Sequence, residues 1–76
     1  MDINNVVFFD ARPVLGRQVR RLRKKSGLTQ DVVAENCGIF RTYLSRIENG
    51  TANPTVTVLS ALAKTLDVSI GDFFVE

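Results

Sequence analysis

Five polar side chains between residues 41 and 49 are spaced to share one face of a short helix. They are Arg41, Thr42, Ser45, Arg46 and Asn49. Leu44 and Ile47, three residues apart, form the opposite, apolar seam. A guanidinium can pair bidentately with guanine O6 and N7 in the major groove of DNA, and hydroxyl groups suit bases or phosphates. This row of side chains therefore has the chemistry to contact a double-stranded nucleic acid. The alternative is that it is simply a solvated helix face.

A second short helix precedes this one, and a tight turn joins the two. Thr29 is suited to cap this earlier helix, whose Val33 and Cys37 would face inward. Gly38 fits the position just past its end, where glycine adopts positive φ without a Cβ clash. Helix, glycine-containing turn and helix over residues 29–48 form the signature of a helix-turn-helix motif.

The first helix of the chain is predicted to begin after Asp10, which can cap it. Pro13 is tolerated in the opening turn because its missing N–H would have no helical partner there. Leu15, Val19 and Leu22 then recur at i, i+4 and i+7, which is typical of an amphipathic helix with one face in the core.

Two more helices are predicted after the central pair. Thr55 can cap the fourth helix, and Asp67 ends it. Ser69 and Asp72 are spaced for a capping-box-like pair at the start of a short last helix. The sequence therefore predicts an all-α protein of five helices.

The predicted domain organisation is an N-terminal arm, residues 1–10, followed by one DNA-binding domain, residues 11–76. The run from Val6 to Phe9 is apolar, too short for a globular helix and rich in strand-favouring residues. We interpret it as an extended arm that covers the domain or crosses to a partner subunit, with fraying of the terminus as the alternative.

Composition excludes several classes of protein. The 76 residues make one domain near the lower limit for a chain that buries its own core. Histidine is absent, which removes Ser-His and Cys-His catalysis and the usual zinc sites, so we expect no enzyme, metal or cofactor. The single Cys37 is interpreted as a small buried hydrophobe. No apolar run approaches the roughly 20 residues of a membrane span and no secretory signal is recognisable, so a cytoplasmic protein is expected.

Charge is distributed unevenly along the chain. The formal net charge is only +2, but residues 11–30 hold basic groups and no acidic ones, whereas residues 47–76 are net acidic. The first part can approach a polyanion that the second part would repel. Part of the basic cluster has a structural explanation, because cations at the end of the first helix complement its dipole.

Several pieces of the chain also resemble a known family. The pieces are LRKKSGLTQ, the A-x-x-x-G of Ala34 and Gly38, SRIENG, NP and ALAKTLDVS. Together they make residues 15–74 resemble the phage-repressor-type helix-turn-helix family, also called Xre or lambda-repressor-like. The triplet RTY at residues 41–43 also resembles the controller proteins of restriction-modification systems, which belong to the same family. The resemblance implies a compact five-helix lambda-repressor-like DNA-binding domain.

The motif and the resemblance together assign expected contacts. The helix that starts at Thr29 would direct its N-terminal N–H groups at a phosphate, and the resemblance implies that Gln30 joins them. Arg41 is the predicted base contact, and Tyr43 is expected to contact the backbone or to pack at the flank. The predicted DNA-binding residues are Arg23, Thr29, Gln30, Phe40, Arg41, Thr42, Tyr43, Ser45, Arg46, Asn49, Thr51 and Asn53.

Two of these positions depend on comparison with the family. Phe40 stands where a small capping residue is common; it could pack on Arg41, on a neighbouring chain or on the sugar wall of the groove. By resemblance, Arg23 pairs with Glu48 in a structural salt bridge that ties the first helix to the third.

The loop residues Asn49, Thr51 and Asn53 would position the domain on the DNA backbone without reading sequence.

The predicted function is a sequence-specific transcriptional regulator, a repressor or autoregulator. A homodimer would bind a two-fold symmetric operator on double-stranded DNA, with half-sites about 34 Å apart. No small-molecule ligand and no membrane contact are expected. The predicted dimer interface consists of Val68, Ile70, Phe73 and Phe74. The rival hypothesis is a protein-interaction or antitoxin-like module that keeps this fold and binds a partner through the aromatic residues near both ends.

Overall fold

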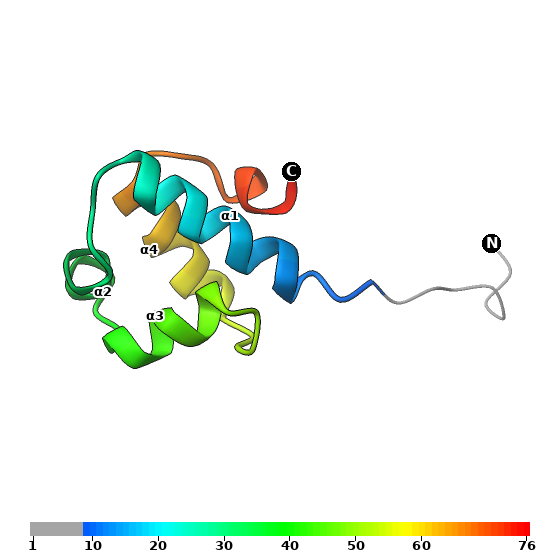
Figure 1. The fold of residues 1–76 in the computed structure, drawn as a ribbon, viewed down its shortest axis with the longest axis horizontal. Helices are drawn as coiled ribbons and strands as arrows, with labels where there is room; N and C mark the ends of the chain where they lie inside the picture. The colour runs from blue at the N-terminus through cyan, green and yellow to red at the C-terminus, as the bar shows by residue number, and fades with distance from the viewer. Residues whose placement is uncertain (1–8) are drawn as a thin grey trace, which may run out of the picture.

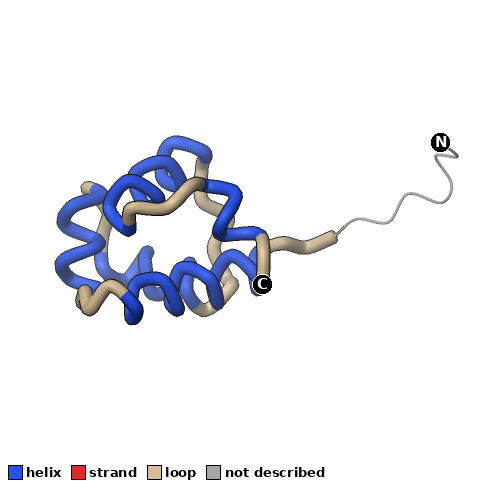
Figure 2. The backbone as a smooth tube through the Cα atoms, turned by 90° about the horizontal axis from the view of Figure 1, so that it is seen from above, coloured by secondary structure: helices blue, strands red, loops and turns tan. Residues whose placement is uncertain are grey.

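The computed structural model describes residues 9–76, and this part of the chain folds into helices joined by short loops (Figure 2). The α-helices are α1 (Arg12–Lys25), α2 (Gln30–Cys37), α3 (Arg41–Glu48) and α4 (Val56–Leu66). In Figure 1, α1 runs above α3, α2 lies at the left end of the molecule, and the C-terminal segment returns to α1; α1 packs mainly on α3 and on this segment, and α4 packs mainly on α2. The all-α class predicted from the sequence is confirmed.

The predicted fifth helix is not an α-helix. Residues Ile70–Phe74 form a 3-10 helix, η2, so the described chain has four α-helices rather than five. The backbone N–H of Asp72 donates to the carbonyl of Ser69 at 3.0 Å, and the N–H of Ser69 donates to Asp72 Oδ2 at 3.0 Å. The first is the i to i+3 backbone bond of a 3-10 helix, and the second belongs to the predicted capping box of Ser69 and Asp72.

The helix ends follow local capping chemistry. Thr29 and Thr55 each accept a hydrogen bond at 3.2 Å, from the N–H groups of Val32 and Val58 respectively. Gly38 ends α2 in the left-handed conformation, and Asp67 ends α4 in the same way with φ of 56°. These predicted boundaries are confirmed. The threonine oxygens satisfy free N–H groups that begin each helix, and the left-handed residues end the helices.

The predicted cap of α1 differs by one residue. The N-cap is Ala11, which makes no side-chain bond, while Asp10 Oδ1 accepts the backbone N–H of Arg12 at 3.1 Å. The side chain of Arg12 also donates to this carboxylate, and these hydrogen bonds lower the pKa of Asp10 to about 2. Asp10 therefore serves the first turn from just outside the helix.

The core lies between the helices and is closed by η2. Its largest fully buried side chains are Phe73, Leu44, Ile47, Leu62, Val19 and Val33. Phe73 brings η2 into the core, and buried Gln18 on α1 donates to the carbonyl of Val75. Cys37 is half-buried against this core, with Sγ 3.4 Å from Thr65 Oγ1.

Gly16 lets α1 cross the last turn of α3 at very close range. A Cβ at this position would lie 2.6 Å from the carbonyl oxygens of both Ile47 and Glu48. These are backbone atoms of a helix and cannot turn aside as a flexible side chain can. The approach of α1 to α3 therefore requires a residue without a side chain.

Residues 1–8, which include most of the proposed apolar arm, lie outside the described part of the chain. Phe9, its last member, is 76% exposed. Among residues 9–76, no helix is both long and apolar enough to cross a membrane.

We predict that Gly16→Ala lowers the free energy of unfolding by about 1 to 3 kcal/mol, because the added methyl overpacks the contact between α1 and α3. The higher helix propensity of alanine, worth about 1 kcal/mol, offsets only part of this cost. Denaturant unfolding measures the difference. The matched control is Gly71→Ala, whose new Cβ would meet only Ser69 Oγ at 3.8 Å. Equal stability of the two variants would contradict the close-approach argument.

Candidate nucleic-acid interface

The helix α3 presents a polar face to solvent and an apolar face to the core. Leu44 and Ile47 are fully buried, while Arg41, Thr42 and Arg46 are exposed. Asn49 is exposed just past the helix end, and Ser45 is half-buried between the two faces. Tyr43 is also half-buried and packs against the core from the flank. The predicted outward row is therefore accessible at its two arginines, at Thr42 and at Asn49.

A buried carboxylate fixes the other end of this helix. The side chain of Glu48 has no exposed surface, and Arg23 from α1 donates two hydrogen bonds to it, Nε to Oε2 at 2.7 Å and Nη2 to Oε1 at 3.0 Å. Gln30 Nε2, from the first turn of α2, donates to Glu48 Oε1 at 3.2 Å. The structure thus brings together Arg23, Gln30 and Glu48 from three helices.

The environment of Glu48 keeps it ionised. Burial raises its pKa, but hydrogen bonds from Arg23 and Gln30 and the charge of Arg23 outweigh burial, so the net pKa of Glu48 lies below its ordinary value. Arg23 also donates Nη1 to the carbonyl of Leu28 at 3.1 Å, which fixes its guanidinium plane. Its side chain is only 12% exposed. The main role of Arg23 is therefore structural: it pairs with Glu48 inside the fold, and only a small part of its side chain reaches the surface.

Arg20 belongs to the same cluster, although the sequence analysis did not select it. Its Nε lies 3.4 Å from Glu48 Oε1, and its Nη2 donates to Asn49 Oδ1 at 2.6 Å. The signal was present, because residues three apart on a helix share a face, and Arg20 lies three residues before Arg23. Arg20 thus holds the side chain of Asn49 at the end of α3.

A second interaction missed by the sequence analysis involves Arg41. Its Nε lies 3.5 Å from Oδ1 of Asp31, in the first turn of α2, and both side chains are largely exposed. No local pattern predicts this pair, because it depends on how α2 and α3 pack. An exposed pair at this distance contributes little stability, so the guanidinium can leave Asp31 for a stronger acceptor.

The loop after α3 is tied back to the helix. Thr51 Oγ1 donates to the carbonyl of Arg46 at 3.2 Å, and Arg46 Nη2 donates to the carbonyl of Thr51 at 3.4 Å. Thr51 and Asn53 are exposed beside the helix end. At the start of α3, Phe40 is the N-cap, makes no side-chain cap bond and is 82% exposed.

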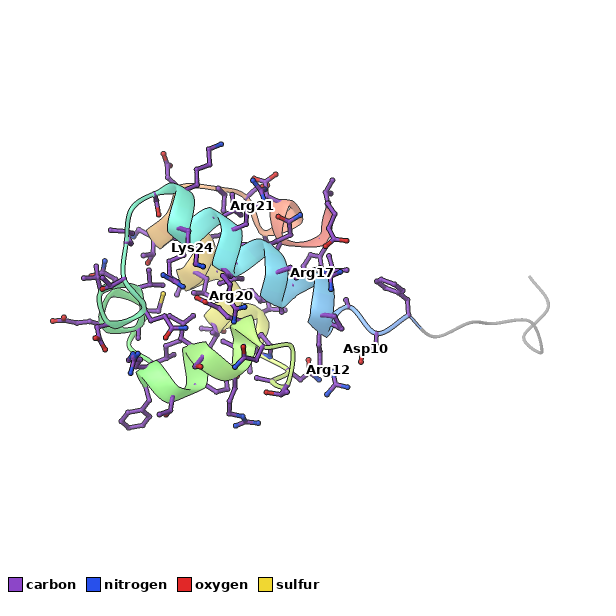
Figure 3. All side chains as sticks on the ribbon, in the orientation of Figure 1. Asp10, Arg12, Arg17, Arg20, Arg21 and Lys24 are labelled. Atoms are coloured by element: carbon purple, nitrogen blue, oxygen red, sulfur yellow. The ribbon has the colours of Figure 1, made fainter. Side chains whose placement is uncertain are left out.

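Basic side chains also run along α1, and Figure 3 labels Arg12, Arg17, Arg20, Arg21 and Lys24. Several of them are engaged within the chain: Arg17 with Glu76, Arg20 with Glu48, and Arg21 with Gln18. Lys24 and Lys25 are exposed at the C-terminal end of α1, where cations complement the helix dipole. Much of the basic run is therefore already engaged within the fold.

The four residues predicted for a dimer interface do not share one environment. Phe73 is fully buried in its own core, so its assignment to a surface contact is corrected. Adjacent Phe74 is 43% exposed, and Val68 and Ile70 are half-buried at the surface of the core. The 3-10 turn of η2 directs one of the two aromatic rings inward and leaves the other outside.

This arrangement of helices matches a known protein family. The family model described as Helix-turn-helix, HTH_3, matches residues 19–73. The chain therefore belongs to the helix-turn-helix family of the Xre, or lambda-repressor-like, type.

Similar proteins include regulators and controller proteins. The uncharacterized HTH-type transcriptional regulator y4dJ of Sinorhizobium fredii is 45% identical over 60 residues, which cover 79% of this chain and 78% of the relative. The restriction-modification controller protein C.AhdI of Aeromonas hydrophila has a TM-score of 0.81 at 29% identity, over 87% of this chain and 100% of its own. The biofilm regulator SinR in complex with DNA has a TM-score of 0.72 at 33% identity, over 78% of this chain and 95% of its own.

We predict that Arg23→Met lowers the free energy of unfolding by about 3 kcal/mol or more near neutral pH, because it removes the main partner of a buried carboxylate. Replacing both members with methionine restores much of this loss, since no unpaired charge then remains buried. Arg12→Met is the matched control: it breaks the exposed pair with Asp10 and is expected to change the free energy of unfolding little. Denaturant unfolding of the four proteins measures these differences.

The same pair makes stability depend on pH in a definite direction. Since the folded-state pKa of Glu48 is lowered, its contribution is present above the pKa of an unfolded glutamate, about 4.3. It is lost as pH falls through the lower folded-state value. The difference in free energy of unfolding between the wild type and Arg23→Met is therefore expected to narrow as the pH falls below about 4.3. A gap that stayed constant into acid would show that the ion pair is not its source.

Proposed function

We propose that the protein is a sequence-specific DNA-binding transcriptional regulator that inserts α3 into the major groove. The observation that carries this proposal is the exposed face of α3, with Arg41, Thr42 and Arg46 accessible on a helix whose opposite face is fully buried. The width of the groove admits one α-helix, and the N-terminal part of a recognition helix contacts base edges in this motif. Membership of the family and the similarity to DNA-bound SinR support the proposal.

The DNA contact proposed for each side chain follows from its position on the helices. Arg41, at the first position of α3, is the main base contact, with Thr42, Ser45 and Arg46 further along. The backbone N–H groups that begin α2, beside Thr29 and Gln30, face a phosphate.

The remaining contacts position the domain. Asn49, Thr51 and Asn53 approach the sugar-phosphate backbone from the loop after α3, and Tyr43 reaches it from the flank. Arg23 contributes through Glu48 and through its small exposed edge. Since phosphate contacts carry no base information, these residues set orientation rather than sequence preference.

We propose that two copies bind a two-fold symmetric operator, with half-sites about one helical turn, or 34 Å, apart. One short α3 offers few base contacts, so a single copy would read too little sequence for a specific site. Val68, Ile70 and Phe74 form the proposed contact between copies. Control would then depend on concentration and operator arrangement, as a repressor or autoregulator. The similarity to C.AhdI supports a role like that of restriction-modification controllers.

We predict that the wild-type protein enriches a two-fold symmetric sequence from a library of randomised duplex DNA. Arg41→Ala is expected to lower affinity for the enriched site by about 5- to 100-fold and to relax preference at one base pair in each half-site, because a bidentate contact with guanine is lost. Titration by fluorescence anisotropy at several salt concentrations measures both effects. Arg17→Gln, which removes one charge beside Glu76, is the matched control and should change affinity little.

Weak binding without sequence preference, unaffected by Arg41→Ala, would overturn the proposal. The protein-interaction hypothesis would then take its place, with the exposed Phe9 and Phe74 as the residues to test.

We predict that Asp31→Asn raises affinity for DNA of any sequence by several-fold and lowers discrimination between the operator and random DNA. Asp31 lies 3.5 Å from Arg41 in the free protein and would lie close to phosphates in the complex, where its charge repels them. Glu35→Gln is the control, because it removes one negative charge from the same helix without touching the Arg41 pair. Equal gains from both variants would assign the effect to net charge rather than to this contact. Competition binding against random duplex measures the discrimination.

A further inference from the structure

Phe40 occupies an unusual place for a large apolar side chain. It is 82% exposed, the largest exposed fraction among the large apolar residues of the described chain. It is also the N-cap of α3, with φ of −73° and ψ of 144°, and it makes no side-chain cap bond. Phe40 therefore offers nothing to the core and nothing to the free N–H groups of the helix.

The backbone explains why Phe40 is outside the core. If α3 continued one residue earlier, Phe40 would share a face with Leu44, four residues on, which is fully buried. The carbonyl of Phe40 does accept the N–H of Leu44 at 3.1 Å, the first backbone bond of the helix, as expected of an N-cap residue. Its extended ψ, however, takes Phe40 out of the helical path, and its side chain is left exposed rather than buried on the Leu44 face. A serine or threonine here would cap the helix and expose no apolar surface.

We propose that Phe40 determines sequence specificity by packing on the C5-methyl group of a pyrimidine, thymine in unmodified DNA, next to the base that Arg41 reads. The inference rests on the proposed function, because it requires α3 to lie in the major groove. The thymine methyl is the one apolar group that the base edges present in that groove. A phenyl ring has no donor or acceptor for phosphates or polar base edges, whereas burying it against a methyl removes apolar surface from water.

Two other occupants of this surface are possible on chemical grounds, and the test separates them. The sugar wall of the groove would take the ring without regard to base identity. A protein partner would take it without DNA. The position of Phe40 at the residue directly before Arg41 favours the base edge, because the N-terminal residues of a recognition helix are those that reach bases.

The experiment measures coupling between the ring and single methyl groups. Each thymine of the operator selected by the wild-type protein is replaced in turn by deoxyuridine, which lacks only the methyl. Wild type is expected to lose about fourfold in affinity per half-site at one symmetry-related position, as for one buried methyl group. Phe40→Ala is expected to bind the thymine and deoxyuridine operators alike at that position, and Phe40→Leu to retain part of the discrimination.

A second variant keeps folding separate from recognition. Phe40→Ser supplies a capping hydroxyl, so its melting temperature is expected to rise, while its response to the missing methyl disappears. Higher stability together with lost discrimination supports the proposal, because a merely structural role of Phe40 would move stability alone.

Three results would overturn the inference. If Phe40→Ala weakens binding but keeps the same response to deoxyuridine, the ring contacts the sugar wall instead. If Phe40→Ala binds every operator as wild type does, the ring is not at the DNA and a protein partner replaces the base as its occupant. If the wild type selects no operator at all, the proposed function fails and this inference fails with it, whereas in the first two cases the proposed function stands.

Discussion

The carboxylate of Glu48 is ionised and fully buried, and the arrangement of the first three helices depends on how its charge is compensated. Removing an unpaired carboxylate from water costs roughly several kcal/mol, a large part of the whole free energy of unfolding of a small domain. Arg23 and Gln30 meet the carboxylate from α1 and α2. Any shift of α3 relative to either helix would strip a donor from a buried charge, so this one group fixes both the register and the angle of α3.

A rigid attachment matters because α3 has only eight residues. Isolated helices shorter than about 12 residues are marginal in water, so nearly all the stability of α3 comes from tertiary contacts. Glu48 holds its last turn, Gly16 lets α1 pack directly on its final carbonyl groups, and Leu44 and Ile47 hold its middle. These contacts all lie on one side of the helix. The other side is left to polar residues that take no part in the core.

Local chemistry made the helix boundaries predictable, whereas contacts between helices were predictable only in part. Thr29, Gly38 and Thr55 mark helix ends because each solves a backbone problem within a few residues. The Asp31 contact to Arg41 follows from packing and has no local signal. The adjacent rings Phe73 and Phe74 look equivalent in sequence, and only the 3-10 turn separates the buried one from the exposed one. The same turn explains why the predicted fifth α-helix is absent.

The distribution of charge bears on how such a small domain reaches a useful affinity. Arg17, Arg20 and Arg23 carry much of the basic charge of α1 but have acidic partners within the chain. Affinity for DNA rises with the number of phosphates that a protein neutralises, so cations already paired in the fold contribute less to it. A single copy would therefore bind weakly, which is a second reason, beside site length, for our proposal that two copies bind together. If two copies bind as we propose, the dimer concentration rises with the square of the monomer concentration while monomer predominates, so operator binding would respond steeply to the abundance of the protein.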